Sequence, residues 1–148
     1  MTFVREFMEY KPWGACRILV VVEDDRRCQV QEFLREHAMT HPMEYKKIAN
    51  SLRRAVSHGP RDIHDEGMCK IVGDVGEFKA RRELLRVFWF FADSKQIDNR
   101  RVDTIVLTHA ARPNKGQEQE REIAKAKIML ARYRECPFPE CEGEEETP

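Results

Sequence analysis

Basic side chains recur along the middle of the chain, in and beside strand-like runs of apolar residues. Lys79 and Arg81 alternate along one predicted strand, so we expect them to point to the same face of a sheet. Arg86 is the one charged residue in the apolar run 84–91 (LLRVFWFF). Because an isolated guanidinium is costly in such a strand, Arg86 is either paired or opens onto a functional surface.

Arg112 and Lys115 follow the next predicted strand. If these strands are neighbours in one sheet, the five cationic side chains gather on one concave face. Such a cluster can bind phosphate groups through bidentate arginine contacts. The alternative is structural: Arg86 pairs with Glu77 or Glu83, and the other cations are ordinary surface charges.

The familiar motifs for cofactors and catalysis are missing from the sequence. It has no GxGxxG, no phosphate-binding GxxxxGK loop, no HExxH and no GxSxG. His64-Asp65-Glu66 and the pair Cys136 and Cys141 are weak metal candidates, which we interpret as a solvated turn and as two thiols in a loose tail. We therefore expect no cofactor and no metal. The cysteine count is odd, at five, which favours free thiols in a reducing compartment over a disulfide framework.

The formal net charge of zero hides an uneven distribution. The chain has 26 basic and 26 acidic residues, but six of the acidic ones lie after Arg134, where no basic residue occurs. Residues 1–134 therefore combine 26 basic with 20 acidic residues and carry a formal charge of +6. A basic domain of this kind remains suited to an anionic partner such as a nucleic acid.

Hydrophobic periodicity predicts an α+β fold in one domain, residues 1–134, followed by an acidic, disordered tail, residues 135–148. No apolar run is long enough for a membrane span and the N-terminus lacks a signal core, so we expect a cytoplasmic protein without a membrane partner. The pattern places an N-terminal strand before a helical hairpin, then a mostly antiparallel sheet and a C-terminal helix. The expected strands are 15–22, 69–72, 75–81, 84–91 and 102–109, and the expected helices are 27–38, 42–58 and 117–133.

The ordered set of motifs over residues 14–134 resembles the RelE/ParE toxin superfamily, and most closely its HigB-like, phage-derived branch. In that branch a helical hairpin precedes three strands, a basic turn and a helix of the E-I-x-x-A type. The matching segments are Gly76-Glu77-Phe78-Lys79, Leu85-Arg86-Val87-Phe88-Trp89-Phe90, Ile105-Val106-Leu107-Thr108-His109-Ala110-Ala111, and Glu122-Ile123 with Ala126 and Tyr133.

The resemblance implies a type II toxin–antitoxin toxin that cuts messenger RNA on the ribosome. Its partners would be the ribosome, mRNA and an antitoxin protein with a helix-turn-helix. The implied chemistry needs no metal, because the RNA 2′-hydroxyl attacks the adjacent phosphate while a base accepts its proton and cations stabilise the transition state.

The resemblance also implies roles for individual residues. Arg86 takes the position of the phosphate-binding arginine, with Lys79 as a further catalytic residue. His109 is either the general acid or base or a packed histidine at the end of a strand. The remaining RNA-binding positions are Arg81, Arg112 and Lys115.

The chain departs from the family pattern near the predicted site. The usual pair of lysines in the turn reads Pro113-Asn114, and the aromatic residue before it is Ala111. A basic position of the cleaving members is Glu77 here, a carboxylate that either serves as base or holds Arg86. Two alternatives therefore stand beside the nuclease: a non-catalytic relative that binds RNA or protein, and a gyrase inhibitor of the ParE type.

Overall fold

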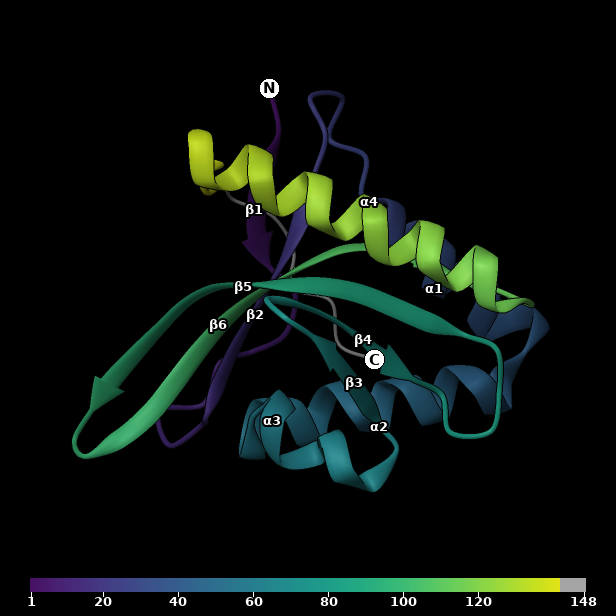
Figure 1. Cartoon of the computed structure of the whole chain (residues 1–148), viewed down its shortest axis with the longest axis horizontal. Coiled ribbons are helices and arrows are strands. Elements are labelled where there is room, and N and C mark those ends of the chain that lie inside the picture. The colour runs from purple at the N-terminus through teal and green to yellow at the C-terminus, as the bar shows by residue number, and fades with distance from the viewer. Residues whose placement is uncertain (142–148) are drawn as a thin grey trace.

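The computed structural model describes the backbone of residues 1–141 and every side chain among them except that of Asp65. Its architecture is α+β, as expected (Figure 1). The strands are β1 (Phe3–Glu6), β2 (Cys16–Val22), β3 (Cys69–Val72), β4 (Val75–Lys79), β5 (Arg86–Ile97) and β6 (Arg100–Ala111). The helices are α1 (Gln29–Thr40), α2 (Pro42–His58), α3 (Pro60–Ile63), the 3₁₀-helix η1 (His64–Glu66) and α4 (Gly116–Glu135).

The six strands form one sheet in the order β1-β2-β6-β5-β4-β3. Strands β3 to β6 pair antiparallel with their neighbours in the sequence, while β2 lies parallel to β6. A parallel neighbour requires a long crossover, and the α1–α2 hairpin begins that connection after β2. The prediction of a mostly antiparallel sheet with a helical hairpin and a C-terminal helix is therefore confirmed.

Helices cover both faces of the sheet, α1 and α2 on one and α4 on the other (Figure 1). The central strand β5 explains why both faces are apolar, because its residues 87–90 are all fully buried. Val87 and Trp89 contribute to the core beneath α1 and α2, while Phe88 and Phe90 contribute to the core beneath α4. Alternation along the strand thus supplies two cores from one apolar run.

Gly76 in β4 provides the space for Trp89. A Cβ atom at this position would lie 2.3 Å from Trp89 Cζ2. The indole packs directly on the β4 backbone, so no larger residue fits there without displacing it.

Two strand predictions were incomplete. Strand β1 was not predicted, because its four residues are too few to show a period. The segment 92–101 was expected to be a polar connection, but it completes a long β5–β6 hairpin that projects from the sheet (Figure 1). Residues of this arm pair only with each other and are mostly exposed, so their polar pattern resembles that of a loop.

The chain after α4 was expected to be disordered, and this was wrong for residues 136–141. The Val4 N–H donates to the Pro139 carbonyl at 3.0 Å, and the Cys141 N–H donates to the Val4 carbonyl at 2.9 Å. Phe138 packs edge-on against Tyr133 of α4. These residues therefore cover the outer edge of β1, and the predicted tail residues 142–148 lie outside the described residues.

Candidate functional site

The predicted cations lie at one end of the sheet, where β4 ends, β5 begins and β6 ends. Lys79 faces Arg86 across the β4–β5 pair, and Arg86 faces Ala111 across the β5–β6 pair. The expectation that these strands are neighbours is therefore confirmed. We call the five residues Lys79, Arg81, Arg86, Arg112 and Lys115 the cationic end.

Arg81 is in the turn between β4 and β5 and not on the strand, so its predicted alternation with Lys79 was wrong. The chain leaves the strand after Lys79 and reverses through Arg82, which has a φ of 66°. The Glu83 N–H donates to the Ala80 carbonyl and closes the turn at 2.8 Å. Arg81 is exposed and remains part of the cationic end.

Arg86 is held by backbone carbonyls and by one carboxylate. Its Nη1 donates to the carbonyls of Glu83 at 2.5 Å and Leu85 at 2.9 Å. Its Nε lies 3.7 Å from Glu77 Oε1, an ion pair that is too long for a hydrogen bond. Among the described residues, no hydrogen-bond acceptor contacts Nη2. Burial lowers the pKa of Arg86 and the charges of Glu77 and Glu44 oppose this, but a guanidinium stays protonated in proteins.

Glu77 is fully buried between the sheet and α4. Its Oε1 accepts a hydrogen bond of 2.5 Å from Gln119 Nε2, and within residues 1–141 its Oε2 has no hydrogen-bond partner. The carboxylate of Glu83, the other partner considered for Arg86, instead pairs with Lys47 at 3.1 Å. The geometry supports a role for Glu77 in holding Arg86 rather than in accepting a proton from a substrate in solvent.

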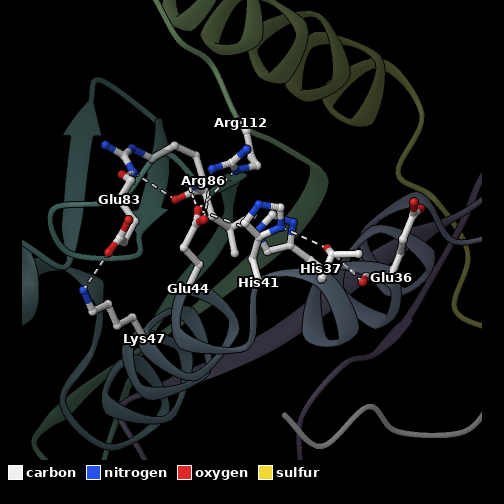
Figure 2. A network of polar contacts seen from close by, with 10 residues as sticks. Glu36, His37, His41, Glu44, Lys47, Glu83, Arg86 and Arg112 are labelled. Carbon is white, nitrogen blue, oxygen red and sulfur yellow. Dashed lines mark hydrogen bonds and ion pairs between the residues drawn. The ribbon is translucent and has the colours of Figure 1, made fainter.

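Arg112 does not share a face with Arg86, contrary to the predicted convergence. Because Ala111 is the register partner of Arg86, the next residue points to the opposite side of the sheet. There Arg112 makes a bidentate contact with Glu44 of α2 (Figure 2), from Nε to Oε1 at 3.2 Å and from Nη2 to Oε2 at 3.0 Å. The Nε–Nη2 edge of its guanidinium is therefore directed to the protein.

Glu44 also ties α2 to the start of β5. Its Oε1 accepts a hydrogen bond of 3.1 Å from the Leu85 N–H. Burial acts to raise the pKa of Glu44, but the hydrogen bonds and charge of Arg112 outweigh it and hold that pKa below its usual value. Glu44 is therefore an ionised carboxylate in a buried position.

His109 lies beneath α4. Its ring stacks on Phe88 with centroids 4.9 Å apart, and its Nδ1 is 2.8 Å from the hydroxyl of Thr108. Its Nε2 lies 2.6 Å from Glu122 Oε2, close but not aligned as a hydrogen bond. Burial lowers the pKa of His109 and the charge of Glu122 opposes this. These contacts favour the packed strand histidine over the general acid or base.

Lys115 directly precedes α4 and is exposed. A hollow of about 330 Å³ lies on the other side of the cationic end, next to the β4–β5 turn. The residues that line it are Lys47, Asn50, Ser51, Met68, Arg81 and Arg82, three of which are cationic. Sequence reasoning missed Lys47 and Arg82, because a basic residue in a charged helix or turn carries no sign of what it faces.

One group of side chains has the composition of a metal site, contrary to the sequence-based expectation. Ligand atoms of His37, His41 and Glu44 lie within 4.8 Å of one another. The two histidines are four residues apart, and His41 caps the end of α1, where its N–H donates to the His37 carbonyl at 2.7 Å. The i, i+4 spacing was thus visible in the sequence and was overlooked.

Within residues 1–141, no helix combines the length and apolarity needed to cross a bilayer. No protein-family model, no curated protein and no solved structure matches the chain. Evidence for its function therefore comes from its own residues and their geometry.

Proposed function

We propose that this protein is a toxin-type endoribonuclease that binds messenger RNA on the ribosome with its cationic end. The observation that carries the proposal is the pairing of Lys79 with Arg86 on adjacent strands. Two backbone carbonyls and Glu77 orient the Arg86 guanidinium. Its Nη2 donates no hydrogen bond to any residue that the structure describes. A positioned guanidinium with free donors next to an amine suits a phosphate group.

In the proposed reaction the RNA 2′-oxygen attacks the adjacent phosphorus. The new O2′–P bond replaces the P–O5′ bond, the 2′-hydroxyl loses its proton and the 5′-oxygen gains one. Arg86 and Lys79 would stabilise the negative charge that develops on the non-bridging oxygens. Arg81 and Lys115 would bind flanking phosphates, since both are exposed at the same end. We assign His109 to packing in this scheme, because it lies under α4 against Glu122.

The proposal includes the setting that such a nuclease requires. We place the protein in the cytoplasm, where translating ribosomes supply the mRNA. We further propose that a helix-turn-helix antitoxin silences it. The element order agrees with this assignment, because a helical hairpin between strands and a final helix over the sheet are what the sequence resemblance implies.

The test is cleavage of a defined mRNA on purified, translating ribosomes. We expect cuts with the wild type, and a rate lower by about 100-fold to 1000-fold with Arg86→Ala, as for loss of a donor to a transition-state oxyanion. Lys95→Ala is the matched control, because Lys95 is an exposed cation on the projecting β5–β6 arm. Full activity of a folded Arg86→Ala protein would refute the proposed site.

A non-catalytic RNA-binding protein is the second candidate, and one observation favours it. Glu77 and His109, the two groups considered as a base, are both held beneath α4. RNA binding that depends on Arg86, without any cleavage on ribosomes, would support this candidate over the nuclease.

A further inference from the structure

Three potential metal ligands meet at the corner between α1 and α2. His37 is in the last turn of α1, His41 joins the two helices, and Glu44 is in the first turn of α2. Figure 2 shows the two imidazoles next to the Glu44 carboxylate. One ligand atom of each residue lies within 4.8 Å of the others. The corner therefore gathers two imidazoles and one carboxylate from adjoining turns.

The imidazole of His37 is the strongest sign of a ligand. Its side chain is only 6% exposed, and its Nε2 has no hydrogen-bond partner among the residues that the structure describes. A buried polar atom of this kind is unfavourable unless something binds it. Nε2 lies 3.6 Å from Glu44 Oε1, which is too long for a hydrogen bond. Two ligands bound at about 2.0–2.1 Å to a tetrahedral zinc ion lie about 3.4 Å apart, so this separation fits a shared ion.

His41 is oriented by a neighbouring hydroxyl. Its Nδ1 lies 3.0 Å from Thr40 Oγ1, which also donates to the Glu36 carbonyl at 3.3 Å. An outer contact of this type commonly orients a metal-binding histidine and leaves its other nitrogen for the ion. The rings of His37 and His41 stack with centroids 4.5 Å apart, and ligand atoms of both lie within 4.8 Å of a Glu44 oxygen.

The arginine next to the carboxylate is compatible with this arrangement. Arg112 Nη2 contacts Glu44 Oε2 at 3.0 Å, while the oxygen nearer His37 is Oε1. Oε1 also accepts from Leu85 N–H and from Arg112 Nε, the latter at 3.2 Å. An ion would replace the Nε contact and leave Oε2 held by the guanidinium. Because that guanidinium repels a dication, we expect micromolar affinity rather than that of a closed structural site.

We propose that His37, His41 and Glu44 bind a divalent transition-metal ion of the zinc type, with water in the fourth position. Two imidazoles and a carboxylate are a ligand set that zinc accepts. The ion would link the last turn of α1 to the first turn of α2. This inference does not depend on the proposed action on RNA.

The test is zinc titration of the full chain against a chromophoric chelator. The background carries Cys136→Ser and Cys141→Ser, because these cysteines are the two that are not buried and would bind zinc themselves. We expect one ion per chain, and a loss of affinity of more than ~100-fold with His41→Ala, since even outer contacts contribute 10–100-fold. His58→Ala, which removes an exposed histidine from the other end of α2, should leave the affinity unchanged.

Cobalt absorption provides a second measurement on the same proteins. A tetrahedral Co²⁺ spectrum that is lost in His41→Ala and kept in His58→Ala would support the site. His41 is the primary variant because it is more exposed than His37, so its loss is less damaging to the core. Zinc affinity that is equal in the wild type, His41→Ala and His58→Ala would overturn the proposal, as would the absence of binding at micromolar zinc.

Discussion

Two buried glutamates hold arginines at the same end of the sheet, one on each face, and they hold them differently. Glu44 forms two hydrogen bonds with Arg112, at 3.0 and 3.2 Å. Glu77 is more deeply buried, but its Oε1 lies 3.7 Å from Arg86 Nε and accepts its hydrogen bond from Gln119 instead. Both pairs are carboxylate and guanidinium, and only the first is a bidentate contact.

The difference separates two roles that the sequence could not distinguish. Glu44 occupies the Nε–Nη2 edge of Arg112, one of the edges through which a guanidinium binds a phosphate in a bidentate contact. Arg86 is fixed in place by carbonyls and keeps free donors, so it is pre-organised and still able to bind. We therefore infer that the Glu44 pair holds the fold together and that the Glu77 pair positions a ligand-binding residue.

The largest expected effect is on RNA cleavage under the proposed function. Arg86→Ala should lower the cleavage rate by about 100-fold to 1000-fold, because it removes a positioned donor from the transition state. Arg112→Ala should lower it by less than about 10-fold, because Arg112 is already bound to Glu44. Single-turnover rates on ribosomes measure both. Equal losses in two proteins with native circular dichroism would show that the two arginines act alike.

The next effect is on stability. Glu77→Ala should destabilise the fold by about 3 kcal/mol, because it leaves the guanidinium of Arg86, 17% exposed, buried without its charge partner. Glu44→Ala should lower the free energy of unfolding by about 2 kcal/mol, mainly through the unpaired Leu85 N–H. Its partner Arg112 is 34% exposed and can turn to water. Urea unfolding measures both values, and a larger loss for Glu44→Ala would reverse the ranking.

A smaller effect is the pH dependence of stability. Burial lowers the pKa of His37 and of His109 from the usual 6.5. The unfolded chain therefore binds protons before the folded one, so stability is full above pH 6.5 and falls as the pH drops below it. Glu44, whose pKa is lowered from 4.5, adds its own loss only at more acidic pH.

Urea unfolding across this pH range, in the presence of a chelator, measures the effect. His109→Gln should remove the part of the pH dependence of the unfolding free energy that comes from the histidine beneath α4. His37→Gln should remove the part that comes from the histidine beside α2. An unchanged profile in both variants would show that neither histidine controls the acid response.

The smallest effect concerns the salt dependence of RNA affinity. Lys79→Ala should reduce the slope of log affinity against log salt concentration by about 1, since one phosphate contact is lost. Lys95→Ala, on the projecting arm, should leave the slope unchanged. Binding of a short single-stranded RNA at several salt concentrations measures both. A slope that is the same in the wild type and Lys79→Ala would remove Lys79 from the binding surface.

Much of the fold was predictable from local pattern. The apolar run in β5 was assigned to a central strand, and its residues 87–90 are all fully buried. The helical period identified α1, α2 and α4 to within a few residues. The segment 92–101 was missed because these parts of β5 and β6 form strand pairs only with each other. They need no buried apolar face, so they show no apolar alternation. Residues 136–141 were missed because their partner is the edge of β1, far away in the sequence.

The sequence by itself determined that these cations stand near the ends of apolar strands, because hydrophobic period and turn residues mark where such strands begin and end. Only the tertiary structure decided what each of them faces. Register placed Ala111 opposite Arg86 and so turned Arg112 to the other side of the sheet, toward Glu44. The packing of α4 covered His109 and paired it with Glu122. Ion-pair partners are set by contacts between distant segments, and a local pattern of residue types does not encode them.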